Sequence, residues 1–178
     1  MNLPVFTIGH STRLLAEFVN LLQQADVTLV VDVRTVPRSR TNPQYNRETL
    51  SLSLSEFHIA YDHIAALGGL RGRQQGIPPG VNAFWDNASF HNYADYAMTA
   101  PFRSGLEALR ALAHAQRCAI MCAEAVWWRC HRRIIADYLL HENETVFHIL
   151  GKGRLEPARL TESAQPGANG TLIYPANG

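Results

Sequence analysis

One short segment, MCAEAVWWRCHRR at residues 121–133, concentrates side chains that can carry out chemistry. Cys130 falls near the predicted start of a helix among several arginines, and both features lower the pKa of a thiol toward neutrality. Cys122 ends a predicted strand close to Glu124, whose negative charge opposes ionisation. The spacing therefore predicts Cys130 as the reactive thiolate and Cys122 as its neutral partner or as a wall of the site.

The same spacing permits a disulfide, because seven residues separate the two cysteines and let the chain turn back from a strand end to a helix start. The chain has three cysteines, and an odd number indicates reduced thiols in a cytoplasmic protein. Cys118 lies early in the preceding strand and is expected in the core. We expect free thiols, and a bridge between Cys122 and Cys130 remains the competing interpretation.

Three residues near these thiols are candidates for proton transfer. His10 follows the first apolar run, Glu124 follows the strand that contains Cys122, and His131 is adjacent to Cys130. Imidazole and carboxyl groups are the usual general acids and bases of enzymes. The position of His131 relative to the apolar stripe of its helix directs its ring toward the sheet.

An arginine-rich segment, DVRTVPRSR at residues 32–40, follows the second apolar run. Guanidinium groups bind carboxylates and phosphates through paired hydrogen bonds. We expect Arg34 and Arg38 to hold a small anion, with Ser39 and Asp32 as further ligand-binding candidates. The competing interpretation is a local ion pair between Asp32 and Arg34 on a solvated rim.

Two more candidates for the anion site lie at predicted helix starts. Ser11 occupies, with its neighbour Thr12, the position of an N-cap, where free N–H groups also attract anions. Arg132 lies in the first turn of the helix that follows Cys130. Arg133 precedes an aspartate by four residues and is expected to form a surface pair instead.

Motifs of several other chemistries are absent from the sequence. A phosphatase loop requires an arginine at a fixed distance after its cysteine, and Trp128 and Ala136 stand at those positions. A structural zinc site needs two closely spaced ligand pairs, which the cysteine spacing does not provide. Neither a Walker loop nor the dinucleotide-binding glycine pattern occurs. We therefore expect no metal and no cofactor.

The composition narrows the class of protein. Hydrophobic residues make up 47% of the chain, and the formal net charge of +1 gives no general argument for a nucleic-acid or membrane partner. No segment reaches the roughly 18 apolar residues of a membrane span. The first residues lack the pattern of a signal peptide. We expect a cytoplasmic protein with no membrane partner.

Strands and helices are predicted to alternate along the chain. The apolar patterns predict strands at 5–9, 28–34, 57–61, 118–124 and 145–150, and helices at 14–22, 47–54, 91–98, 102–116 and 130–141. This alternation indicates a single α/β domain over residues 1–178, with a mainly parallel sheet flanked by helices. Residues 156–178 are expected to form an irregular C-terminal tail packed on it. The carboxyl ends of parallel strands meet at one edge, where the candidate residues should converge.

Four motifs in the same order, TIGHS, DVRTVPRSR, LGGLRG and MCAEAVWWRCHRR, resemble the domain-of-unknown-function 488 family over nearly the whole chain. The resemblance implies a single α/β domain, no established reaction, and a noted cysteine pair that matches Cys122 and Cys130. One departure is Ala158, where such proteins often carry a histidine. The resemblance nominates His10, Ser11, Asp32, Arg34, Pro37, Arg38, Ser39, Cys122, Glu124, Cys130, His131 and Arg132.

These residues together predict an enzyme, a hydrolase or transferase, that acts on a small anionic or phosphate-bearing ligand. The alternative is a non-catalytic module for single-stranded nucleic acid or a protein partner, with Trp127 and Trp128 as a stacking surface. An enzyme requires a concave pocket with acid, base and anion-binding groups in mutual reach. A binding module requires an open basic face with exposed indoles.

Overall fold

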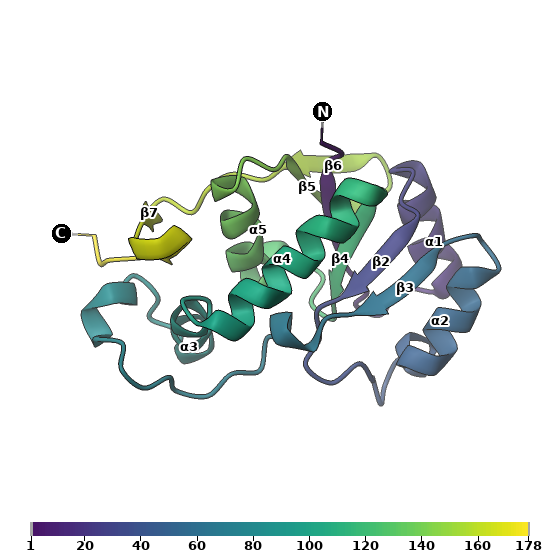
Figure 1. The fold of residues 1–178 in the computed structure, drawn as a ribbon. Helices are drawn as coiled ribbons and strands as arrows, with labels where there is room; N and C mark the ends of the chain where they lie inside the picture. The colour runs from purple at the N-terminus through teal and green to yellow at the C-terminus, as the bar shows by residue number, and fades with distance from the viewer. Residues whose placement is uncertain (1, 178) are drawn as a thin grey trace.

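A twisted sheet with helices on both faces forms the centre of the protein (Figure 1). The computed structural model describes residues 2–177, so residues 1 and 178 of the predicted domain lie outside the described part. The strands are β1 (Val5–Gly9), β2 (Leu29–Asp32), β3 (Ala60–His63), β4 (Cys118–Cys122), β5 (Val146–Gly151) and β6 (Arg154–Pro157). Their order is β3-β2-β4-β1-β5-β6; β1 to β5 pair in parallel, and β6 runs antiparallel to β5. The predicted α/β class with a mainly parallel sheet is confirmed.

Helices cover both faces of this sheet, which explains why the central strands are apolar along their whole length. The helices are α1 (Leu15–Gln24), α2 (Arg47–Ser55), α3 (Ala88–Tyr96), α4 (Ala100–Ala115) and α5 (Arg132–His141). Phe18 of α1 and Leu50 of α2 pack with Ile8 on one face. Leu106 of α4 and Ile134 of α5 pack on the other. Every residue of β1, β2 and β4 is buried as a result.

Most predicted elements are present with boundaries shifted by a few residues, and two of these boundaries bear on the site. The helix predicted from residue 14 is capped by the backbone of Leu14, so the expected side-chain cap at Ser11 is wrong. Ser11 instead adopts a positive φ of 47° and begins a turn, in which the Arg13 amide donates to the carbonyl of His10. The strand predicted at 57–61 begins only at Ala60, because His58, with φ of 59°, ends the turn after α2.

The parallel register brings the ends of β1, β2 and β4 to the same level. Gly9 pairs with Cys122, and Asp32 pairs with Met121. The helices that follow β1 and β4 pack on opposite faces of the sheet. A crevice is expected where the chain direction diverges in this way, at the carboxyl ends of the strands.

Gly9 is required by the close approach of the loop after β4. A Cβ atom at Gly9 would lie 1.8 Å from the carbonyl oxygen of Glu124, a backbone atom. A substitution would therefore push the loop that carries Glu124 away from the end of β1. The glycine of the TIGHS motif thus sets the distance between two segments of the site.

The chain after residue 156 lies against α5 and the segment before α3. It contains the short antiparallel pair β7 (Gln165–Pro166) and β8 (Leu172–Ile173). Tyr174 is fully buried, its hydroxyl donates to Asp137 of α5, and its amide donates to the Asn82 side chain. The carboxylate of Asp137 also accepts the amide of Thr161. This segment therefore holds α5 and the start of the α3 region together (Figure 1).

Candidate functional site

A cavity of about 440 Å³ opens at the carboxyl ends of β2 and β4. Its walls come from the segments after these strands, from the loop before α3, from α3 itself and from the residues that precede α5. The lining residues are Arg34, Thr35, Val36, Arg38, Gly69, Leu70, Ser89, Phe90, Tyr93, Cys122, Ala123, Glu124, Arg129, Cys130 and His131.

Six of the eleven residues predicted for the site line this cavity, and five do not. Those in the wall are Arg34, Arg38, Cys122, Glu124, Cys130 and His131. Those outside it are His10, Ser11, Asp32, Ser39 and Arg132. The residues in the wall include both paired cysteines and His131, so the cavity is where a ligand could meet a thiol.

The two thiols form a buried pair. All three cysteines are free, and Cys122 and Cys130 both line the cavity, where each shifts the pKa of the other. The thiol of Cys130 also accepts the backbone N–H of Arg132 at 3.4 Å, which places its sulfur at the N-terminus of α5. The thiol of Cys122 lies 3.7 Å from the carbonyl oxygen of Glu124. Cys118, at the other end of β4, lies in the core as expected.

Arg132 is the cation of this pair and not a ligand for a substrate anion. Its side chain is 1% exposed, and its Nε donates to the Cys122 sulfur at 3.0 Å. Nη1 donates to Thr7 at 2.9 Å, and Nη2 donates to the Glu124 carbonyl at 2.7 Å. These donors are occupied inside the protein and Arg132 does not line the cavity, so the structure gives no support to the role in holding a ligand that was expected for Arg132. The residue stabilises negative charge on sulfur instead.

The two cysteines differ in acidity in the expected direction. Burial raises the pKa of Cys130, but the hydrogen bond from Cys122 and the charge of Arg132 outweigh it, and the pKa falls to about 7. Burial and the hydrogen bond to Cys130 raise the pKa of Cys122 well above its usual value. When the pair ionises, the thiolate is therefore Cys130 and the protonated thiol is Cys122.

His131 stands directly beside the Cys130 sulfur. Its Nε2 lies 2.7 Å from the carbonyl oxygen of Val33, which can only accept, so Nε2 carries the proton. Nδ1 is then unprotonated and lies 3.4 Å from the Cys130 sulfur. Tyr93 packs edge-on against the ring, and a Cβ atom on Gly69 would lie 2.5 Å from Nδ1. Burial lowers the pKa of His131, so the ring is neutral near pH 7 and presents this unprotonated nitrogen to the Cys130 sulfur.

A second layer of buried polar residues holds Arg132. The hydroxyl of Thr7 accepts from Arg132 and lies 2.7 Å from Nδ1 of His148. Trp127 stacks on the His148 ring with centroids 4.5 Å apart. Burial and the nearby Arg132 lower the pKa of His148 to about 3. Sequence reasoning missed Thr7 and His148, although a polar residue inside an apolar, doubly covered strand signals a buried partner.

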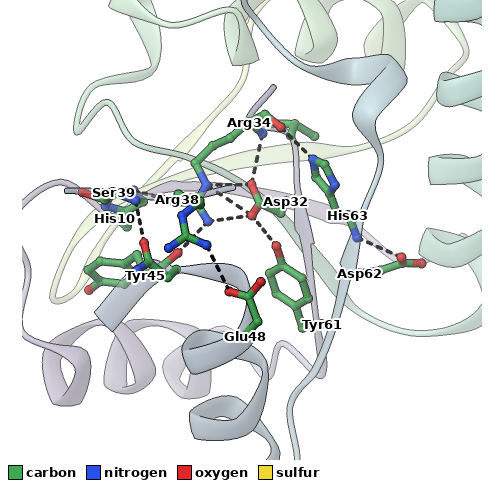
Figure 2. A network of polar contacts seen from close by, with 12 residues as sticks. His10, Asp32, Arg34, Arg38, Ser39, Tyr45, Glu48, Tyr61, Asp62 and His63 are labelled. Carbon is green, nitrogen blue, oxygen red and sulfur yellow. Dashed lines mark hydrogen bonds and ion pairs between the residues drawn. The ribbon is translucent and has the colours of Figure 1, made fainter. Parts of the chain in front are cut away.

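Asp32 and Arg34 form a buried bidentate ion pair (Figure 2). The guanidinium donates to both carboxylate oxygens, at 2.9 Å from Nε and 2.7 Å from Nη2. Tyr61 also donates to Asp32, whose oxygens are therefore fully occupied. The local pair proposed as the competing interpretation is present, but it is buried and not solvated. Asp32 orients Arg34 and does not line the cavity, so the structure gives no support to the ligand-binding role expected for Asp32.

His10 lies beneath Arg34 and not in the cavity. Its ring is 2% exposed and stacks on Tyr45 with centroids 4.2 Å apart. Its Nδ1 lies 2.8 Å from the carbonyl of Ser11, and its Nε2 lies 3.4 Å from Nη1 of Arg34. Burial lowers the pKa of His10, so the ring is neutral and supports Arg34. His10 does not line the cavity, so the structure gives no support to the proton-transfer role expected for it.

The two serines of the prediction organise loops. The amide of Ser11 donates to the carbonyl of Ala123, which fixes the first turn against the loop after β4. The hydroxyl of Ser39 accepts the amide of Asn42, and its own amide donates to Asn46 (Figure 2). Neither side chain reaches the cavity, so both shape the segments around it.

Exposed charges ring the mouth of the cavity. The Arg38 side chain is 62% exposed, with Glu48 at 3.8 Å as its nearest carboxylate. Arg129 and Glu124 are exposed on the opposite wall. Arg129 was not among the expected ligands, although it lies in the segment at residues 121–133 that contains both paired cysteines. The buried Arg34 adds a third cation to the wall.

Apolar side chains cover the wall opposite the cysteines. Phe90 of α3 is fixed by stacking on Trp85, with centroids 4.9 Å apart. Leu70 is 75% exposed and Val36 is 56% exposed at the rim. Large apolar side chains that stay exposed beside a cavity are typical of a binding surface. The cavity therefore combines a cationic rim with an apolar wall.

The tryptophan pair does not form an open stacking surface. Trp127 is occupied by its stacking on His148, and only Trp128, at 45% exposed, presents an indole to solvent. Both residues lie outside the cavity wall. The tryptophan pair therefore lacks the two exposed indoles that the binding module requires.

A larger cavity of about 560 Å³ lies between residues 73–79 and α3. It contains His91 and Asp95 but no cysteine, so the thiol-containing cavity remains the candidate site. Within residues 2–177, no group of three or more metal-ligating side chains is close enough to hold an ion. None of the helices in the described chain is long and apolar enough to cross a membrane.

Comparison with known proteins gives a family. A family model described as a domain of unknown function, DUF488, matches residues 14–139 of the chain. The matched range contains the cavity-lining arginines, both paired cysteines and His131. No curated protein and no solved structure gives a significant match.

Proposed function

The chain belongs to the DUF488 family, a domain of unknown function, and we propose that it is a thiol-dependent hydrolase or transferase acting on a small anionic substrate. The observation that carries this proposal is the position of Cys130. Its sulfur lies in the cavity wall, at a helix N-terminus, beside an unprotonated imidazole nitrogen and next to a buried arginine. These contacts activate a cysteine as a nucleophile.

The proposed reaction uses Cys130 and His131 in turn. His131 accepts the thiol proton at Nδ1, and the Cys130 sulfur attacks an electrophilic carbonyl or phosphoryl centre and displaces the leaving group. His131 returns the proton to that leaving group. Water or a second substrate then releases the group from sulfur, which gives hydrolysis or transfer. Glu124, exposed in the same wall, is the carboxylate available to deprotonate that acceptor.

Arginines at the rim account for the preference for an anion. Arg38 and Arg129 are exposed and mobile enough to meet an incoming carboxylate or phosphate, and the buried Arg34 provides a fixed guanidinium. Fork-shaped donors suit both groups. We also propose a cytoplasmic location, since free thiols persist in a reducing compartment; cell fractionation with antibody detection tests this.

The direct test combines ligand binding with detection of a covalent intermediate. Thermal unfolding is measured against inorganic phosphate, nucleotides and small carboxylates, for the wild type and for Arg38→Ala. A ligand at 100 times its Kd adds about 2.7 kcal/mol, which raises Tm by about 5–10 °C for a chain of this size. Arg38→Ala should reduce the shift. The ligands that bind are then offered as activated esters, thioesters or phosphoanhydrides, and intact mass is recorded.

A substrate-derived mass on the wild type that is absent from Cys130→Ser supports the proposal. Cys118→Ala provides the matched control, because Cys118 is fully buried at the other end of β4 and does not line the cavity. An adduct that persists in Cys130→Ser, or an anion-induced shift unaffected by Arg38→Ala and Arg129→Ala, would contradict it.

A further inference from the structure

We propose that Cys122 and Cys130 form a redox-active dithiol that exchanges with small disulfides carrying a negatively charged group. This inference rests on the proposed function, since it uses Cys130 as the nucleophile. It goes beyond it by making Cys122 the resolving thiol and by adding a two-electron reaction to the same cavity.

The placement of the two sulfurs is the first argument. Both cysteines line one cavity, and Arg132 donates to both sulfurs, from Nε to Cys122 at 3.0 Å and from its backbone N–H to Cys130 at 3.4 Å. Cys122 is the last residue of β4, and Cys130 lies two residues before α5, so rigid elements hold both positions. The loop between them contains a short turn of helix at Trp127–Arg129. Closure of a bridge therefore requires movement of two side chains that contact the same arginine.

The second argument is the unequal state of the two thiols. A dithiol exchanges efficiently when one sulfur is ionised to attack and the other stays protonated until it is needed. Cys130 has the lowered pKa of about 7, and Cys122 has the strongly raised one. Once Cys130 is bonded to a substrate sulfur, the hydrogen bond that raises the Cys122 pKa is lost. Arg132 Nε, 3.0 Å away, then favours the Cys122 thiolate.

The reaction balances without a further reagent. The Cys130 thiolate attacks one sulfur of a small disulfide R–S–S–R, and the first R–S⁻ leaves. Cys122, losing its proton to solvent or to His131, attacks the Cys130 sulfur and displaces the second R–S⁻. The protein ends as a disulfide that has lost two electrons, and the small disulfide becomes two thiols. The reverse reaction reoxidises small thiols.

Arg132 sets the direction in which this exchange is favourable. Reduced protein gives this 1%-exposed cation a thiolate partner, whereas the disulfide leaves it with Thr7 and a backbone carbonyl. A buried charge that loses its counter-charge is destabilised. The reduced form is therefore favoured, and the bridge is expected to be easily reduced, with a potential less negative than that of a structural disulfide.

The cavity wall indicates which small disulfides fit. Arg38 and Arg129 at the rim attract a carboxylate or phosphate, and Leu70, Val36 and Phe90 face an apolar body. An aromatic disulfide with carboxylates meets both demands. The probe is 5,5′-dithiobis(2-nitrobenzoate), whose released thiolate is coloured.

The experiment measures the released thiolate by its absorbance and the protein by intact-mass spectrometry. Fully reduced wild type, at neutral pH and with a slight excess of the probe, should release two thiolates per chain and finish lighter by two hydrogens, with no adduct. Cys122→Ser should release one thiolate and retain one adduct on Cys130. Cys130→Ser should react far more slowly, and Cys118→Ala should behave as the wild type. Thermal unfolding of each variant verifies that it is folded.

The outcomes separate this inference from the proposed function. Wild type that keeps a single stable adduct on Cys130, or that carries two adducts, overturns the dithiol while Cys130 remains a nucleophile. Wild type whose Cys130 does not react overturns both. A bridge that forms but resists reduction by a large excess of monothiol overturns the assigned role of Arg132.

Charge selectivity is tested with a matched pair of disulfides. Arg38→Glu and Arg129→Glu should slow the anionic probe roughly tenfold at low salt. The same variants should leave the rate with uncharged bis(2-hydroxyethyl) disulfide nearly unchanged. An equal loss for both disulfides would show that the rim arginines do not select charge.

Discussion

The chemistry of Cys130 depends on which neighbouring side chains contact its sulfur and that of Cys122. The sequence contains several arginines close to this cysteine, and the one that tunes the thiols is Arg132, from inside the protein. Arg129 and Arg38 are exposed, and we propose that they bind the substrate. Spacing alone predicts which residue types gather, and the direction of each guanidinium decides its role.

The acidity of Cys130 can be measured by alkylation. We expect the rate with iodoacetamide to rise with pH around a midpoint near 7, because Cys122 and Arg132 stabilise the thiolate. Cys122→Ala removes a hydrogen-bond donor and should move the midpoint upward, whereas Cys122→Ser keeps a donor and should move it less. A midpoint near the ordinary value of about 8.5 in the wild type would contradict the arrangement.

His148 predicts a loss of stability in acid. Its pKa falls from 6.5 in the unfolded chain to about 3 in the folded protein, so the unfolded chain binds the extra proton between these values. Unfolding free energy should therefore fall as pH drops below about 6.5, by up to about 1.4 kcal/mol per pH unit for this group. His10 and His131 act in the same direction.

His148→Gln should flatten that slope, because glutamine offers Thr7 an acceptor and does not titrate. The control is His58→Asn, at an exposed position. Urea unfolding at several pH values measures the effect. An unchanged slope in His148→Gln would show that His148 does not become protonated on unfolding.

At the scale of elements, strands could be predicted from the sequence where apolar residues run without interruption. β1, β2 and β4 are apolar along their length because helices cover both faces, and this pattern identified them. β3, at the edge, alternates between exposed and half-buried residues and was misplaced by three residues at its start. The helix after β1 was predicted to within one residue of its start, but its cap was wrongly assigned to Ser11, which takes up a left-handed turn whose amide donates to the carbonyl of Ala123.

The loop before α3 controls the thiol site through Gly69. A Cβ atom at this position would lie 2.5 Å from His131 Nδ1, the nitrogen that faces Cys130. We expect Gly69→Ala to displace the imidazole and to slow alkylation of Cys130 several-fold. Gly72→Ala is the matched control, because a Cβ atom there meets nothing within 4 Å. Equal alkylation rates in the two variants would exclude this role.

At the scale of the molecule, the segment after residue 156 holds in place two elements that contribute to the cavity wall, through contacts outside the cavity. It holds α5, which begins beside Cys130, and the region before α3, which carries Phe90. Asp137 is the shared contact, since its carboxylate accepts from Thr161 and Tyr174. The apolar patterning predicted that a segment returns to the body. The buried carboxylate that receives it was not predictable, because it looks like an ordinary helical aspartate.

Asp137 adds a second pH dependence of opposite sign. Burial raises its pKa from 3.8 to about 6, so its stabilising effect is complete below about 3.8 and is lost as pH rises through about 6. Asp137→Asn, which is neutral throughout, should therefore gain on the wild type as pH rises from 4 to 7. Unfolding free energies of the two proteins across this range measure the difference. A constant difference would mean that Asp137 is ionised normally.

The order of strands has a consequence for biosynthesis. β1 lies between β4 and β5 in the sheet, although both follow it by more than half of the chain. At about 5–20 residues per second, a ribosome needs roughly 6–20 s to reach β4 after β1 has emerged. During that interval the apolar β1 strand has neither of its partners. Chaperone binding to the nascent chain is therefore expected at β1, and the sheet can close around it only after the cysteine-bearing strand has been made.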